Sequence, residues 1–172
     1  MGLDASNKAY GDKFEKVLAP VWLQSWHGPN AKITLMADGT IEQKLGCDVV
    51  VSEFIQQKVG LPVERITKYQ IKSRRETKPD FCFQVFKRDG RWQLDVPDAH
   101  FYLWYIPAYR EEPIRICVED VRRIFELHSK EWWIFEDKDK SNGGYFFVSV
   151  AKMNEYIREV TRFPEIESAE AV

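Results

Sequence analysis

The segment Gly46-Cys47-Asp48-Val49-Val50-Val51 places one acid directly before three consecutive β-branched residues. Such a run is typical of a strand inside a sheet, because both faces of that strand then meet apolar neighbours. The sequence therefore predicts a central strand over residues 48–54, with the carboxylate of Asp48 at its first position.

The next predicted strand, over residues 65–75, alternates polar and apolar side chains. Residues two apart on a strand point to the same face, so Gln70 and Lys72 share a face. Because the two strands follow each other in the chain, we expect Asp48 to lie at the end of the strand next to this polar pair.

The remaining predicted elements follow from hydrophobic spacing and turn signals. A helix begins at Ser6 and carries apolar residues up to Trp22, with Pro20 as a kink or an end to its regular part. The others are a strand at 32–36 with a hairpin signal at Asp38-Gly39, a hairpin of strands 81–86 and 91–96, a strand at 99–106, a helix at 118–128, a strand at 145–150 and a helix at 152–160.

This order predicts an α/β (α+β) fold in which a central mixed β-sheet is flanked by helices. We expect one domain over residues 1–163, followed by an acidic, flexible tail over 164–172.

Composition sets the class of protein. With 44% hydrophobic residues among 172, the chain has enough apolar material for a core, which excludes wholesale disorder. Its longest apolar run, residues 101–109, is shorter than the about 20 residues that span a bilayer, so no membrane segment is predicted. The N-terminus does not predict a secretory signal, and three cysteines without a CxxC spacing favour a reducing cytoplasm.

The formal net charge of −2 conceals an uneven distribution. Residues 65–91 hold nine basic side chains against three acids, and such a local excess is typical of a surface that binds a phosphate backbone. A solvated hairpin face explains the same pattern. The candidate DNA-binding residues are Lys68, Arg74, Arg75, Lys78, Lys87 and Arg88.

Four side chains form the candidate catalytic group: Glu15, Asp48, Gln70 and Lys72. Carboxylate and amide oxygens are the hard ligands that Mg²⁺ prefers, so Asp48 and Gln70, supported by Glu15, are the candidate metal ligands. Lys72 is placed to stabilise charge that develops on a phosphoryl group. Taken singly, each residue also has a structural explanation, as a solvated helix acid, a strand cap or one side of a polar strand face.

The arrangement resembles the PD-(D/E)xK nuclease superfamily over residues 7–106. The matching motifs are GxxFE (Gly11 to Glu15), GxD (Gly46 to Asp48) and QxK (Gln70 to Lys72). Cys47 stands where that pattern has proline, and Gln70 stands in place of the acid, a form similar to some restriction and homing endonucleases. The αβββαβ order of the superfamily fits only loosely after Lys72.

The resemblance implies a restriction-endonuclease-like core and a Mg²⁺- or Mn²⁺-dependent deoxyribonuclease that hydrolyses phosphodiester bonds. Cutting both strands of a duplex takes two active sites, so a homodimer or higher homo-oligomer is expected, in a prokaryotic or phage-encoded cytoplasmic setting. Two alternatives remain: a structure-specific, junction-type nuclease, and a catalytically silent nucleic-acid- or protein-binding module on the same fold.

Overall fold

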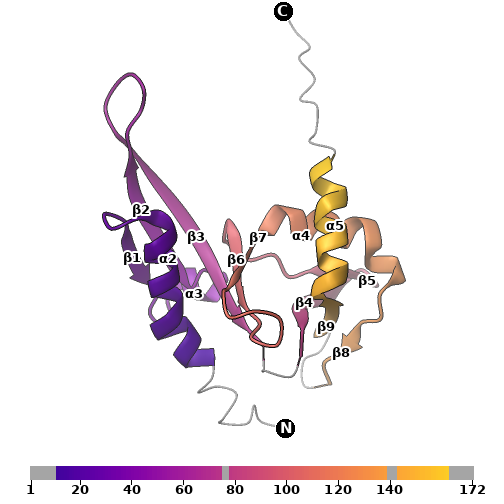
Figure 1. The fold of residues 1–172 in the computed structure, drawn as a ribbon. Coiled ribbons are helices and arrows are strands. Elements are labelled where there is room, and N and C mark those ends of the chain that lie inside the picture. The colour runs from indigo at the N-terminus through magenta and orange to yellow at the C-terminus, as the bar shows by residue number, and fades with distance from the viewer. Residues whose placement is uncertain (1–10, 75–77, 139–142, 163–172) are drawn as a thin grey trace, which may run out of the picture. The chain divides into compact units, whose positions relative to one another are not determined.

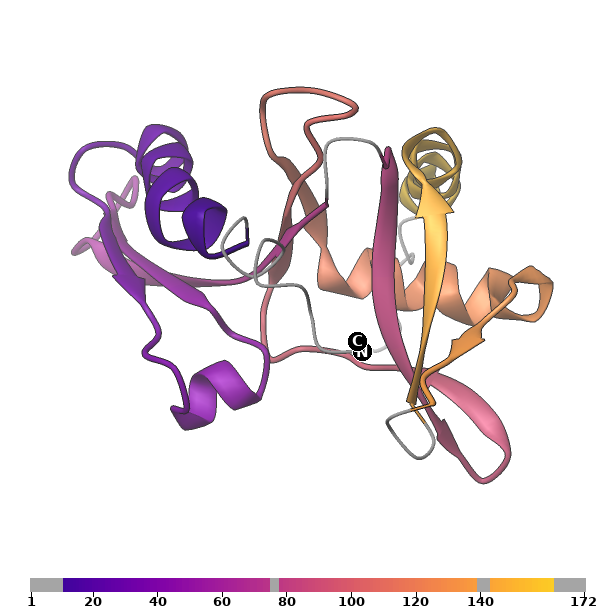
Figure 2. The ribbon, with the colours of Figure 1, turned by 90° about the horizontal axis from the view of Figure 1, so that it is seen from below.

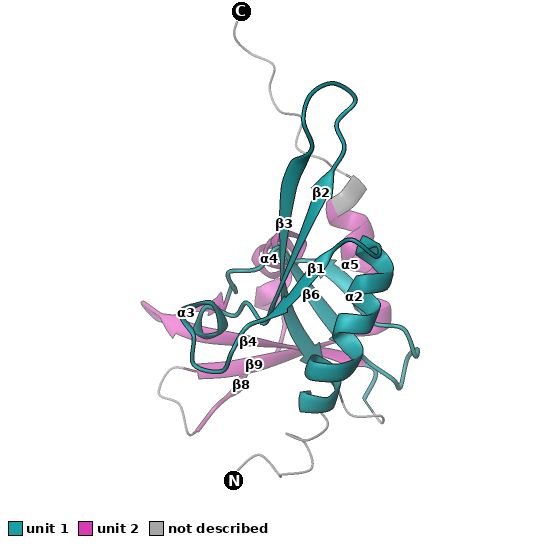
Figure 3. Cartoon of the chain, turned by 90° about the vertical axis from the view of Figure 1, so that its left-hand side faces the viewer, with its two compact units in different colours: residues 1–79, 96–118 teal, residues 80–95, 119–172 magenta. Residues whose placement is uncertain are grey.

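The computed structural model describes residues 11–74, 78–138 and 143–162, and the side chains of these residues up to 160. It divides into two compact units, shown in two colours in Figure 3. Unit 1 comprises residues 1–79 and 96–118, and unit 2 comprises residues 80–95 and 119–172. Ser6 and the predicted tail lie outside the described residues.

Unit 1 contains a five-stranded sheet in the order β1-β2-β3-β6-β7 (Figure 1). Strands β3 and β6 are parallel, and every other neighbouring pair is antiparallel. The predicted α+β fold with a central mixed sheet is therefore confirmed. The strands are β1 (Lys32–Leu35), β2 (Val49–Ile55), β3 (Val63–Ser73), β6 (Phe101–Tyr105) and β7 (Ile114–Cys117).

The first helix contains a π-helical turn, η1 (Phe14–Leu18), followed directly by α2 (Ala19–His27). Within this turn the N–H of Ala19 donates to the carbonyl of Phe14, five residues back. Pro20 has no N–H to donate to the preceding turn, so the irregular hydrogen bonding at this point matches the effect predicted for this proline.

Figure 2 shows this helix lying over one face of the sheet, and the core residues of unit 1 come from both. Phe14 is 1% exposed and stacks on Tyr105 of β6, with ring centroids 4.6 Å apart. Val49 and Val51 of β2 are fully buried, whereas Val50 between them is only half-buried. The helix is thereby held over β2 and β3, where the candidate catalytic side chains begin. The buried residues of this core are Phe14, Ala19, Leu23, Ala31, Val49, Val51, Tyr69, Ile71 and Leu103.

The connection from β1 to β2 is not the tight hairpin that Asp38-Gly39 predicted. A short helix, α3 (Ile41–Lys44), lies between the two strands, and Thr40 caps it by accepting the N–H of Gln43 at 3.3 Å. The Thr40 cap favours a helix after Asp38-Gly39 rather than a tight turn between strands, because its side chain satisfies a backbone N–H at the start of α3.

Unit 2 contains a four-stranded sheet in the order β5-β4-β9-β8. The predicted hairpin is confirmed: β4 (Asp80–Arg88) and β5 (Arg91–Leu94) are joined at Asp89 and Gly90, which both have positive φ. The other elements are α4 (Val118–His128), a 3₁₀ turn η2 (Ser129–Glu131), β8 (Phe135–Glu136), β9 (Gly143–Ser149) and α5 (Val150–Arg162).

One face of this second sheet packs on the helices. Phe83 of β4 and Phe125 of α4 both contact Phe146 of β9, with ring centroids 5.3 and 5.4 Å away. Met153 and Tyr156 of α5 are buried as well.

The path from β3 to β6 departs from the αβββαβ order. Over residues 78–100, all of which are described, the chain forms β4 and β5 and no helix. None of the helices in the described part of the chain is both long and apolar enough to cross a membrane.

Candidate functional site

Asp48 stands directly before β2 and is fixed to β3 by two hydrogen bonds. Its N–H donates to the carbonyl of Tyr69 at 2.9 Å, and its Oδ2 accepts the N–H of Ile71 at 2.7 Å. The ladder of β2 and β3 begins with Val49 opposite Tyr69, so Asp48 comes directly before it. Gln70 and Lys72 share the face of β3 that points away from the helix, because Tyr69 and Ile71, which alternate with them, belong to the core under η1 and α2.

The carboxyl group of Asp48 is buried, with only 9% of the residue exposed. Burial raises its pKa above the ordinary value, while the Ile71 N–H and the positive charge of Lys72 act in the opposite direction. Lys72 follows Ile71 on β3 and acts on this carboxylate through its charge rather than through an ion pair. A buried acid beside a lysine is the kind of group found at functional sites.

Glu15 of η1 belongs to the same electrostatic group. Partial burial raises its pKa, and the next largest cause is the negative charge of Asp48. Packing of Phe14 against Tyr105 holds η1 on the sheet and thus carries the neighbouring Glu15 towards Asp48. A cation near both groups would offset the repulsion that Glu15 experiences from Asp48.

Gln70 lies against Gly46, two residues before Asp48. A Cβ atom built on Gly46 would be 3.0 Å from the Gln70 Nε2 and 2.7 Å from the Cβ of Pro97. Gly46 also has a φ of +85°, which L side chains rarely adopt. In the sequence Gly46 stands out only as part of a motif and nothing marks Pro97, because their contact depends on the distant segment between β5 and β6.

Apart from the bond between Asp48 and Ile71, the four candidate side chains make no hydrogen bond or ion pair with the described residues. Asp48 therefore retains its Oδ1, and Lys72 retains its three donors. Half-buried polar groups without protein partners carry an energetic cost that a ligand can remove. The arrangement can hold a cation at the carboxylates and an anionic group at Lys72.

A hydrogen-bonded group on the helix side of the sheet supports this site. His27 of α2 bonds through Nε2 to the Tyr69 hydroxyl at 2.7 Å and through Nδ1 to the Glu53 Oε1 at 3.0 Å. Tyr69 in turn supplies the carbonyl that receives the N–H of Asp48. His27 thus has the role of a satisfied core histidine and ties α2 to both strands close to Asp48.

The predicted DNA-binding residues divide between the two units. The Nζ of Lys68 bonds to Asp98 at 2.6 Å, and this contact raises the pKa of Lys68. Lys78 is exposed in unit 1, whereas Lys87 and Arg88 lie on β4 in unit 2. Arg74 is half-buried, and Arg75 lies outside the described residues. Lys68 is thus already paired with Asp98, so it does not count among the exposed basic residues that could contact DNA.

The donor set suits a hard divalent cation. In the described part of the chain no three His, Cys, Asp or Glu side chains come together. The oxygen donors near Asp48 are its own carboxylate, the carboxylate of Glu15 on the helix side of the sheet and the amide of Gln70 on the other face. Magnesium is held in proteins by one or two carboxylates together with waters and substrate phosphate. The residues therefore fit Mg²⁺ or Mn²⁺.

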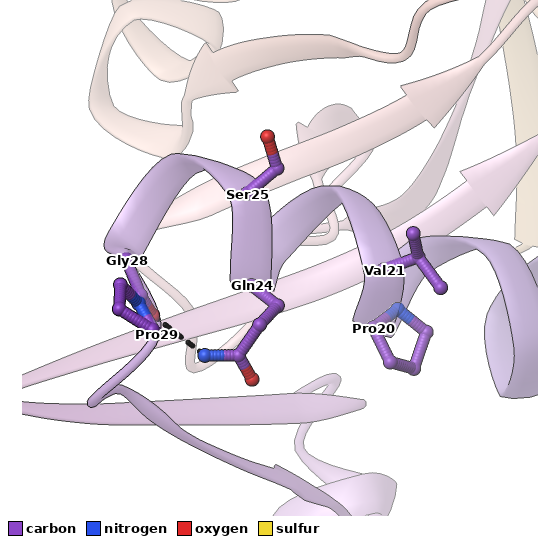
Figure 4. A pocket seen from close by; sticks show the side chains of 6 residues that line it. All are labelled: Pro20, Val21, Gln24, Ser25, Gly28 and Pro29. Carbon is purple, nitrogen blue, oxygen red and sulfur yellow. Dashed lines mark hydrogen bonds between the residues drawn. The ribbon is translucent and has the colours of Figure 1, made fainter.

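A surface pocket lies elsewhere in unit 1, along the outer side of α2. Figure 4 shows its lining and the bond from the Gln24 amide to the Gly28 carbonyl, which measures 2.6 Å. None of the four candidate catalytic residues lines this pocket. Its lining residues are Pro20, Val21, Gln24, Ser25, Gly28 and Pro29.

No protein-family model matches the chain, and no curated protein and no solved structure matches it either. The interpretation of the site therefore depends on its own geometry.

The raised pKa of Asp48 predicts a pH-dependent cost to folding. The folded state holds this proton more tightly than the unfolded chain, so stability should fall as the pH rises from about the ordinary pKa of 3.8 through the raised value. Asp48→Asn keeps an oxygen for the Ile71 N–H and removes the charge. In EDTA it should melt at a higher temperature than the parent at pH 7, and this advantage should vanish near pH 3. An advantage that is constant with pH would contradict the assignment.

Proposed function

We propose that the chain is a metal-dependent DNA endonuclease that hydrolyses phosphodiester bonds. The observation that carries the proposal is the buried carboxylate of Asp48, anchored on β3 by the Ile71 N–H and flanked by Glu15 and Lys72. The match of these residues to the GxxFE, GxD and QxK motifs adds support. We further propose that it acts on DNA as a homodimer in a cytoplasm, to which the free thiols of its three cysteines are suited.

Each residue has a distinct role in this proposal. Asp48 and the amide oxygen of Gln70 hold the ion, and Glu15 adds negative charge directly or through water. When bound, a divalent ion lowers the pKa of a water molecule and neutralises charge on the phosphate. Lys72 donates to the phosphoryl oxygens as their charge increases, and its partial burial strengthens that interaction.

Cleavage of a supercoiled plasmid tests the proposal. The parent should nick or linearise the plasmid in Mg²⁺ or Mn²⁺ and should be inactive in EDTA. Asp48→Asn should lose cleavage, and the control Glu111→Gln, which neutralises an exposed acid in the same unit, should keep it. An active Asp48→Asn protein, or a parent that cleaves equally in EDTA, would refute the proposal.

Gln70→Glu should make the site bind metal more tightly. The substitution adds one negative charge beside Asp48 with little change in shape, so we expect the Mg²⁺ concentration for half-maximal cleavage to fall by about tenfold. Calorimetric titration of Mg²⁺ and Mn²⁺ into both proteins should show the same order. If neither protein binds metal, the silent binding module becomes the better interpretation.

A further inference from the structure

The outer face of the sheet in unit 2 carries exposed aromatic side chains. Trp133, Phe135 and Phe147 are 77%, 46% and 40% exposed, although the inner face of the same sheet is buried under α4 and α5. They form a continuous row: the rings of Trp133 and Phe135 stack at 4.6 Å, and Phe135 meets Phe147 edge-on at 5.5 Å. Three neighbouring aromatic rings in water carry a substantial hydrophobic cost.

The register extends this face to the β4–β5 hairpin. Phe135 is paired with Tyr145, which shares its face with Phe147 two residues on. Gln84 of β4 is opposite Tyr145, so Phe86 and Arg88 follow on the same face, and Phe86 is 37% exposed. The aromatic row on β8 and β9 and the tip of the hairpin thus belong to one sheet surface.

Two arginines meet at the end of this surface. Arg88 of β4 is directly opposite Arg91 of β5, and both are exposed. Like charges opposite each other on neighbouring strands are destabilising, and neither arginine has an acidic partner within the described residues. A bound anion would remove this repulsion.

We propose that this face binds single-stranded nucleic acid. Bases stack on Trp133, Phe135 and Phe147, and backbone phosphates lie between Arg88 and Arg91. Stacking on exposed aromatic rings beside a cationic strand edge is how sequence-tolerant single-strand binding works. The arginine pair favours this occupant over a second protein surface, because it requires a negatively charged partner. The proposal goes beyond the endonuclease activity, because all of its residues lie in unit 2.

Fluorescence anisotropy with labelled oligothymidine and oligouridine tests the proposal, in EDTA and with the Asp48→Asn protein, so that cleavage plays no part. Trp133→Leu and the double variant F135L/F147L should each weaken binding by about tenfold or more. R88Q/R91Q should lower the slope of log affinity against log salt by about 1.4 for two lost single-strand phosphate contacts. The tighter of the two oligomers identifies the natural strand as DNA or RNA.

Two exposed residues provide matched controls. Lys130→Gln removes a charge in the same unit, and Phe54→Leu removes an exposed aromatic ring, 74% exposed, from β2 in the other unit. Both should bind like the parent, and all variants should show the parent's circular dichroism melt. Absence of binding, equal binding by the aromatic variants, or equal affinity for a duplex would overturn the proposal. The proposal would also be overturned if the parent sediments as a homodimer and the Trp133→Leu variant sediments as a monomer.

Discussion

Lys72→Met is expected to reduce Mg²⁺-dependent plasmid cleavage by about 10²- to 10³-fold, the range seen when one donor to a developing oxyanion is removed. Methionine keeps much of the apolar stem of lysine, so packing beside Trp104 of β6, which is opposite Lys72 in the register, should persist. The substitution also removes a positive charge near Asp48. Calorimetry should therefore show Mg²⁺ binding that is unchanged or tighter, which separates a catalytic role from one in holding the metal.

The matched control for this variant is Lys32→Met on β1. Lys32 is exposed and lies in the same unit, so its loss removes one charge without touching the site. Its cleavage rate should equal that of the parent. Full activity in Lys72→Met would exclude this lysine from catalysis, and loss of metal binding in that variant would indicate that the site had not kept its structure.

Gly46→Ala is expected to have the largest effect on stability, about 2–5 kcal/mol. One part of this cost comes from the φ of +85°, which an L side chain adopts only with strain. The other part comes from crowding, because the new Cβ would lie 2.7 Å from the Pro97 Cβ and 3.2 Å from its Cα. The polypeptide near Pro97 or the amide of Gln70 must then move.

Gly39→Ala separates these two contributions. Gly39 has a nearly identical φ of +83°, but nothing lies within 4 Å of its built Cβ. Gly39→Ala should therefore show the conformational cost alone, about 1 kcal/mol. This cost is measured as the difference between the urea unfolding midpoints of variant and parent, multiplied by the slope of the unfolding free energy against urea concentration. Cleavage should stay at the parent's level in Gly39→Ala and fall in Gly46→Ala, since the latter displaces Gln70. Equal destabilisation by the two changes would show that Pro97 and Gln70 relax without cost.

Elements whose pattern is local could be predicted from the sequence. The helix at 118–128 and the hairpin around Asp89-Gly90 agree with the structure because periodicity and turn chemistry act between near neighbours. The strands β7 and β8 were missed because they are only four and two residues long, too short for a hydrophobic period to show. Their strand conformation depends on pairing with β6 and β9.

The candidate site shows the same difference between what local sequence patterns predict and what the tertiary structure adds. Residue types and strand parity were enough to place Gln70 and Lys72 on one face and Asp48 at the start of the neighbouring strand. Only the tertiary structure shows that the Ile71 N–H anchors the Asp48 carboxylate, that burial raises its pKa and that Glu15 lies within its electrostatic reach. These properties depend on the register of β2 against β3 and on the packing of Phe14 on Tyr105, which join residues far apart in the chain.

The basic segment shows the limit of arguments from sequence. Residues 65–91 have a continuous positive charge along the chain, and yet they are shared between two compact units, with Lys68 paired to Asp98. The aromatic row of Trp133, Phe135 and Phe147 is the reverse case. No period in the sequence connects these residues, and yet the fold brings their rings together. Sequence determines local conformation and side-chain chemistry, whereas neighbours across strands, and hence burial and charge pairing, are decided by the tertiary fold.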